Sequence, residues 1–313
     1  MAEQIAGFEQ TVFDALSEVG LNVARVDSNR NYWFIRTDGG NHFDAFITGG
    51  YVAIGWNDVP YTDKENYTEE LLDDLIAKKY GQPTRVLNQI YRFYNEMKEG
   101  DIVFIPSTAS LHFAFGYIVD NEVYEEIISE DDVENGACPY VRRRKVKWFT
   151  NIPKARMDSN LYALFKNHQA ISDGKNYAEY IERAINIFYI KNNVAHFTLT
   201  ANALNNPRVR DIPIFLIGLA DCADNLAREY KLLKENEQID DVISSRINIQ
   251  SPGVMEFIGR PVFVGLLAIA FIGLFGGKAK FEHSKEKTSG EVSTVNLSTK
   301  SRHIKSPVQF YTG

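Results

Sequence analysis

The stretch from residue 31 to residue 56, NYWFIRTDGGNHFDAFITGGYVAIGW, decides the fold that the sequence predicts. It begins and ends with short runs of aromatic and β-branched side chains, 31–36 (NYWFIR) and 51–56 (YVAIGW). Gly, Asn and Asp bound both runs, which is typical of β-strands separated by turns. The two runs therefore predict two strands of a compact β-rich domain.

Three further runs extend this pattern along the chain. Residues 101–106 (DIVFIP) and 113–119 (FAFGYIV) are again aromatic and β-branched, and residues 143–149 (RRKVKWF) alternate charged with apolar side chains. Each run predicts another strand. Between the strand runs at 51–56 and 101–106, the apolar spacing predicts helices at 68–80 and 84–97.

The same periodicity predicts a mostly helical middle region with a few strands. The helices are expected at 3–20, before the β-rich domain, and at 159–168, 177–191 and 212–233, and the strands at 194–200 and 246–250.

A long apolar run lies near the C-terminus. Residues 261–277, PVFVGLLAIAFIGLFGG, contain no charged side chain, and Arg260 and Lys278 flank them. A helix of this length spans about 25 Å, which is at the lower limit for crossing a hydrocarbon core of about 30 Å. The run predicts a single short transmembrane helix, in which small residues such as Gly265 would let helices associate. A buried core element is the alternative interpretation, and the sequence leaves it open.

Composition and charge limit the kinds of protein to which the chain can belong. The chain has 313 residues, of which 44% are hydrophobic and 24% charged, as in globular proteins of about two domains. The net charge is −7, and the acidic residues are concentrated before the tail 278–313, which holds seven Lys or Arg against three Glu. An acidic head argues against non-specific duplex binding, which depends on neutralising many phosphates. The N-terminus lacks the pattern of a secretory signal, so the head is expected in the cytosol.

Motifs for catalysis are missing from the sequence. It has no phosphate-cradling Gly-rich motif, its six histidines are dispersed, and Cys138 and Cys222 sit in no metal-ligand spacing. Asp221 and Asp224 flank Cys222 at helical spacing, but a catalytic cysteine would also need a base that the sequence does not supply. We therefore expect no catalytic residues, no metal, no cofactor and no enzymatic activity. A nuclease at 171–250 is disfavoured, because that region lacks a carboxylate–lysine cluster.

Five blocks in order, NYWFIR, FDAFITGGYVAIGW, RFYNEMKEGDIVFIP, FAFGYIV and RRKVKWF, resemble a PUA-like domain of the EVE/YTH type, as found in bacterial restriction and antiphage proteins. The resemblance covers about residues 28–170. It implies a small twisted β-barrel with an aromatic pocket that reads a modified base or a short nucleic acid. Carried onto this chain, the implied ligand-binding residues are Trp33, Arg36, Trp56, Asn57, Arg92, Ser107 and Thr108.

These residue types suit such a ligand. Aromatic faces stack on bases at about 1–3 kcal/mol each, and Arg offers a planar fork for phosphate. Core roles for Trp33 and Trp56, and surface ion pairs for Arg36 and Arg92, are equally open from the sequence.

The segment RINIQSPG, which leads into the apolar run, resembles the C-terminal part of membrane effectors in antiphage signalling, with the Hailong-type channel effector the nearest. This resemblance implies an effector in the bacterial inner membrane whose cytoplasmic head senses a short single-stranded nucleic acid or nucleotide signal. The head would gate an oligomeric pore or disrupt the bilayer. The implied partners are the lipid bilayer, further copies of the chain and a signal-synthesising nucleotidyltransferase. The alternative is a soluble nucleic-acid-binding specificity module of a restriction-type defence complex.

The predicted fold class is thus α+β. The expected parts are an N-terminal helix at 1–27, a PUA-like β-barrel recognition domain at 28–170, an α-rich oligomerisation and coupling region at 171–250, a transmembrane segment at 257–277, and a polar basic tail at 278–313.

Overall fold

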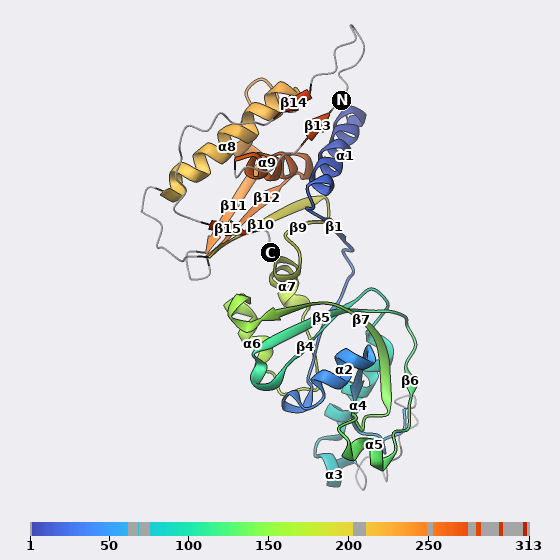
Figure 1. Cartoon of the computed structure of the whole chain (residues 1–313). Helices are drawn as coiled ribbons and strands as arrows, with labels where there is room; N and C mark the ends of the chain where they lie inside the picture. Colours follow the sequence, from blue (N-terminus) through green and yellow to red (C-terminus); the bar gives the residue numbers. More distant parts are fainter. Residues whose placement is uncertain are drawn as a thin grey trace. The chain divides into compact units, whose positions relative to one another are not determined.

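The computed structural model in Figure 1 describes residues 2–61, 68, 76–202, 211–248, 253–274, 280–282, 294–296 and 309–311. Its helices and strands confirm the mixed α+β class. The chain divides into two compact units, and each is considered by itself. The central unit is Asn29–Ile185, and the terminal unit combines Met1–Ser28 with Asn186–Gly313.

The central unit is built on one curled sheet in the order β3-β7-β5-β4-β2-β8, with β6 paired to β7. Strands β2 and β4 are parallel, and the other neighbours are antiparallel. The five predicted strands are confirmed as β2, β3, β4, β5 and β7. The strands are β2 (Tyr32–Ile35), β3 (Tyr51–Ile54), β4 (Ile102–Pro106), β5 (His112–Ile118), β6 (Tyr124–Glu125), β7 (Arg142–Pro153) and β8 (Ile171–Asp173).

The curl of this sheet comes from the long strand β7. Its first residues pair with β3, and from Val146 onward it pairs with β5. The register with β5 shifts between Phe115 and Gly116, and such an irregularity bends and twists a strand. A Cβ on Gly116 would lie 2.4 Å from Val146 Cγ1, so a glycine is needed at this bend.

Apolar clusters cover both faces of the central sheet. Trp33 and Ile35 belong to one cluster, and Tyr32 and Phe34 belong to the other, because successive side chains of a strand point to opposite faces. Short helices complete both layers: η1 (Asp38–Gly40), α2 (Phe43–Gly49), α3 (Lys78–Tyr80), α4 (Pro83–Tyr91), η4 (Arg92–Glu96), η5 (Thr108–Ser110), α5 (Glu130–Glu134), η6 (Lys154–Arg156), η7 (Ser159–Leu161), α6 (Tyr162–Phe165), η8 (Lys175–Tyr177) and α7 (Ala178–Ile185). The predicted helix at 84–97 is confirmed as α4 and η4. Most of the one at 68–80 lies outside the described residues.

The terminal unit has a second sheet in the order β1-β9-β10-β12-β11, with β15 on β10. Its helices α1, α8 and α9 form one apolar cluster with the sheet. Its elements are α1 (Ala2–Glu18), β1 (Val23–Val26), β9 (Phe188–Lys191), β10 (Val194–Asn202), α8 (Asp211–Glu229), η9 (Ile239–Asp241), β11 (Ile243–Asn248), β12 (Gly253–Gly259), α9 (Pro261–Leu274), β13 (Lys280–Glu282), β14 (Thr294–Asn296) and β15 (Gln309–Tyr311).

The apolar run that predicted a transmembrane helix forms the core helix α9 instead. This helix packs against α1, α8 and β10, and nearly all of its side chains are buried. A Cβ on Gly265 would lie 2.5 Å from Val12 Cγ1, so this small residue brings α9 close to α1. Of the helices in the described ranges, none is both long and apolar enough to span a bilayer. The expected segment at 257–277 is corrected accordingly: its first residues belong to β12, and 275–277 lie outside the described residues.

The middle region is mixed rather than mostly helical. The helix predicted at 177–191 ends at Ile185, and β9 and β10 follow as a hairpin. Asn192 and Asn193 have φ of 51° and 61° in its two-residue turn. Asparagine tolerates this left-handed conformation, which hairpin turns of this length require.

Candidate functional site

Four segments of the central unit meet around the start of α2, and we call them the loop cluster: 37–42, 55–57, 106–111 and 138–141. Thr37 Oγ1 donates a hydrogen bond of 2.6 Å to the carbonyl oxygen of Pro106. A Cβ on Gly40 would lie 2.4 Å from Thr108 Cα, so the first and third segments touch through their backbones. The second and fourth touch as well, because a Cβ on Gly55 would lie 3.3 Å from the Tyr140 ring.

Four non-glycine residues of the loop cluster have a left-handed backbone conformation. Trp56 has φ of 62°, Asp38 has 52°, and the consecutive residues Ala109 and Ser110 have 54° and 53°. Few non-glycine residues adopt positive φ, since their Cβ then crowds the backbone. Such conformations cost about 1–3 kcal/mol each and tend to gather at ligand clamps and active sites. This concentration marks the loop cluster as the candidate site.

An aromatic pair joins the first and fourth segments of the cluster. The rings of His42 and Tyr140 have centroids 4.8 Å apart at an interplanar angle of 72°. Burial lowers the pKa of His42, and the Asp38 carboxylate opposes this shift. Burial also raises the pKa of Tyr140, and the negative charge of Asp38 acts in the same direction. Near neutral pH, His42 and Tyr140 are therefore uncharged groups that can both donate and accept hydrogen bonds.

The backbone around Trp56 is fixed by residues on both sides of Tyr140. The buried guanidinium of Arg142 donates from Nη1 to the carbonyl oxygen of Trp56 at 2.8 Å, and from Nη2 to that of Val59. Asn57 Nδ2 donates to the carbonyl oxygen of Pro139 at 2.9 Å, and the backbone N–H of Val141 donates to Asn57 Oδ1 at 3.2 Å. These bonds hold the Trp56 segment to the Tyr140 segment, while the Trp56 ring is only partly buried against the core.

The next two arginines of β7 are also buried. Arg143 donates to the carbonyl oxygens of Tyr140 and Cys138, both at 3.2 Å, so it holds the fourth segment of the cluster from the other face of the strand. Arg144 donates to Phe93 at 2.6 Å and to Tyr94 at 3.0 Å. Their guanidinium groups thus donate to backbone carbonyl oxygens of the fourth segment and of η4, as buried polar groups require.

The structure places four of the seven sequence-predicted residues in the loop cluster: Trp56, Asn57, Ser107 and Thr108. Ser107 Oγ accepts a hydrogen bond from the backbone N–H of His112 at 2.9 Å, and so shapes its own turn. Thr108 is exposed beside Gly40.

The other three lie outside the cluster. Trp33 is 3% exposed, and its Nε1 donates to Asp101 Oδ2 at 2.8 Å, so its ring is a core element. Arg36 donates to the carbonyl oxygen of Asn167 at 2.8 Å, and Arg92 donates to that of Ile171 at 3.1 Å. Both arginines therefore brace the chain that leads to β8.

Sequence reasoning missed Asp38, His42, Tyr140 and Arg142. The run Asp38-Gly39-Gly40, directly after a strand, is a turn signal that could have pointed to the first of these. Tyr140 and Arg142 carry no such signal, because only the curl of β7 brings them beside Trp56.

The cluster offers little for metal binding or nucleophilic catalysis. Burial raises the pKa of the Cys138 thiol, which disfavours the reactive thiolate. Within either unit taken alone, the described residues bring no three His, Cys, Asp or Glu side chains within ligating distance of a common ion.

Residues 33–169 match the model of a family described as "Domain of unknown function (DUF8426)". The match covers less than half of the chain, but it contains the whole loop cluster. The chain matched no curated protein and no solved structure.

Proposed function

We propose that the central unit is a PUA-like domain of the EVE type that binds a base of a short single-stranded nucleic acid or a nucleotide at the loop cluster. The observation that carries this proposal is the partly buried Trp56, held in a left-handed conformation by Arg142 and Asn57 beside the His42–Tyr140 pair. The curled sheet is compatible with the small twisted barrel that the resemblance to this domain type implies.

The groups of the cluster suit a base. The Trp56 ring can stack on a base face at about 1–3 kcal/mol. The carboxylate of Asp38 accepts hydrogen bonds, as from the amino or imino groups of a base edge, and His42 and Tyr140 can bond to either donors or acceptors. The net negative charge of the chain favours a ligand whose base is recognised in one pocket over a duplex that is bound through many phosphates.

Within antiphage defence, this domain fits the role of a specificity module. Such a module recognises a nucleic acid, and a partner protein of the complex carries out the reaction. A pore-forming role is less well supported, because the segment assigned to the membrane is the core helix α9.

The test is binding of a fluorescently labelled single-stranded hexanucleotide to the full chain, followed by fluorescence anisotropy. Trp56→Ala should weaken binding about tenfold, since it removes one stacking surface. Phe149→Ala, which removes an aromatic side chain that is 39% exposed on β7 outside the cluster, should leave affinity unchanged. Equal affinities for the two variants, or no binding by the wild-type chain to any oligonucleotide or nucleotide, would refute the proposal.

A further inference from the structure

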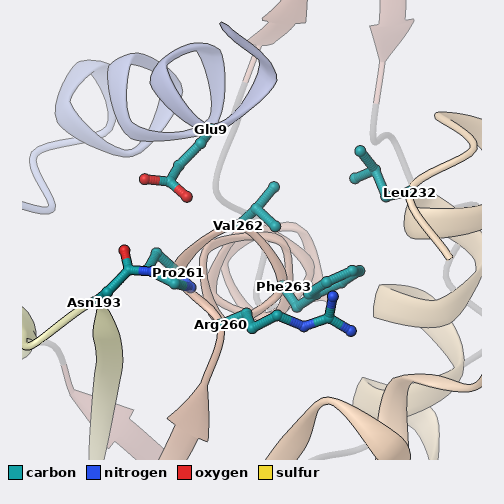
Figure 2. A pocket seen from close by; sticks show the side chains of 7 residues that line it. All are labelled: Glu9, Asn193, Leu232, Arg260, Pro261, Val262 and Phe263. Atoms are coloured by element: carbon teal, nitrogen blue, oxygen red, sulfur yellow. The ribbon is translucent and has the colours of Figure 1, made fainter. Parts of the chain in front are cut away.

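The terminal unit contains a small pocket that is separate from the loop cluster. Figure 2 shows its seven lining residues, which come from α1, the β9–β10 turn, the chain after α8 and the start of α9. The volume of the pocket is about 120 Å³. Since one water molecule occupies about 30 Å³ in the liquid, this is room for a ligand of a few non-hydrogen atoms.

One side of the pocket is acidic and polar. The Glu9 carboxylate extends from α1 toward Pro261 and Asn193 (Figure 2). Glu9 is partly buried, and its side chain takes part in none of the hydrogen bonds or ion pairs among the described residues. Burial raises its pKa, and the charge of Arg25 only partly offsets this. Within the part of the chain that the structure describes, no group donates a hydrogen bond to this carboxylate.

The guanidinium on the opposite side already has a carboxylate partner. Arg260 Nη2 donates to Glu237 Oε1 at 2.6 Å, and the guanidinium lies 4.7 Å from the centre of the Phe263 ring. The backbone N–H of Lys234 and the bond from Arg260 lower the pKa of Glu237, which keeps this ion pair charged. An anionic ligand is therefore not needed to neutralise Arg260. Among the charged groups that line the pocket, Glu9 is the one without an ion pair in the described residues.

The remaining wall is apolar. Pro261, Val262, Phe263 and Leu232 line it. A fitting ligand thus combines a cationic donor, placed at Glu9, with a short hydrocarbon body. A primary ammonium has three N–H donors, so it can use a second acceptor, and Asn193 lines the same pocket.

We propose that this pocket binds a small free organic amine, an ammonium group on a short alkyl chain, with Glu9 as the counter-ion and Asn193 as a second acceptor. The site lies entirely within the terminal unit and does not depend on nucleic-acid binding by the central unit.

The probe is n-butylammonium, titrated into the full chain and followed by ligand-observed saturation-transfer NMR. n-Butanol serves as the matched neutral ligand, because it has the same alkyl body without the charge. n-Butylammonium should bind at least tenfold more tightly than n-butanol. Comparable binding of the two ligands, or none by either, would overturn the proposal.

Three variants locate the site. Glu9→Gln should weaken n-butylammonium binding at least tenfold, whereas Glu18→Gln, which removes an exposed carboxylate from the same helix, should have no effect. Asn193→Asp should strengthen binding, since it adds a second carboxylate at a position whose φ of 61° aspartate also tolerates. If Glu9→Gln and Glu18→Gln bind equally, or if Asn193→Asp weakens binding, the ammonium is not held at Glu9.

A thermal unfolding series tests whether Glu9→Gln keeps its fold. Because burial raises the pKa of Glu9 in the folded chain, the ionised carboxylate destabilises that chain at neutral pH. This destabilisation disappears when the pH falls below 4.5, the ordinary pKa of the group, where Glu9 is protonated in both states. Without ligand, Glu9→Gln should therefore unfold at a higher temperature than wild type at pH 7, and the difference should vanish in acid. A variant that is less stable at pH 7 would mean that Glu9 has a partner in the folded chain.

Discussion

At the scale of single residues, the central unit depends on charged groups that would be expected at the surface. Arg142, Arg143 and Arg144 are consecutive and all buried, and each donates to backbone carbonyl oxygens of neighbouring segments, which are loops for Arg142 and Arg143 and helix η4 for Arg144. Arg142 and Arg143 connect this bracing to the candidate site, because Arg142 fixes the backbone of Trp56 and Arg143 fixes that of Tyr140.

Arg142→Met should destabilise the chain by about 1–3 kcal/mol, since it leaves the buried carbonyl oxygens of Trp56 and Val59 without donors. Urea unfolding checks this value. The exposed Arg156 provides the control, and Arg156→Met should change stability by less than about 0.5 kcal/mol. A loss below that level for Arg142→Met would mean that water or another donor replaces the guanidinium.

The sequence could identify residue types at this scale but not their surroundings. Trp56 and Trp33 both follow strand-like patterns, and both were candidates for the pocket and for the core. Trp33 lies between apolar neighbours with Asp101 as an acceptor, whereas Trp56 lies just beyond its strand in a turn. Tyr140 is distant from Trp56 in sequence, so their proximity depends on the pairing of β3 with β7.

At the scale of elements, the positions of the strands were easier to predict than whether a helix is enclosed by protein or by lipid. The five strand runs are bounded by turn residues and have a distinctive composition, which is why their positions matched. Helix α9 has the composition of a membrane span, because a helix enclosed by protein and one enclosed by lipid both need apolar side chains all round. What distinguishes them is α1, which is far away in the sequence and supplies one wall of the enclosure.

The contact between these two helices can be tested at Gly265. Gly265→Ala should destabilise the terminal unit by about 1–3 kcal/mol, because the new methyl group would overlap Val12. Gly218→Ala is a matched change within α8, where an added Cβ meets nothing within 4 Å. It should stabilise the chain by about 0.5–1 kcal/mol through helix propensity. Chemical denaturation monitors both variants, and effects of the same sign would contradict the close approach of α1 and α9.

At the scale of the whole molecule, the apolar clusters follow the division into two units. Two clusters consist only of central-unit residues, and the third consists only of terminal-unit residues. The terminal unit is discontinuous in sequence, with the central unit inserted between β1 and β9. Local patterns contain no information about such an insertion, because it rests on the parallel pairing of Val23–Val26 with Phe188–Lys191.

The central unit should therefore fold when it is isolated from the rest of the chain, whereas the terminal unit should lose its fold when its N-terminal segment is removed. A fragment of residues 29–185 should unfold cooperatively and bind the same oligonucleotide as the full chain, since its clusters are complete. Deleting residues 1–22 from the full chain should unfold the terminal unit, because it removes the wall that α1 builds against α9. Near-UV circular dichroism and calorimetry of both proteins check this, and a fragment without a cooperative transition would show that the central unit cannot fold alone.

The packing of α1 on α9 also sets an order of events during synthesis on the ribosome. The apolar side chains of α1, such as Val12 and Leu16, are made first, yet their partner helix begins only at Pro261. At about 5–20 residues per second, the interval is some tens of seconds. During that time the inserted unit can complete its own fold, while the nascent helix remains a binding site for chaperones. A slow translation pause after residue 185 would lengthen this exposure without changing a single contact in the finished protein.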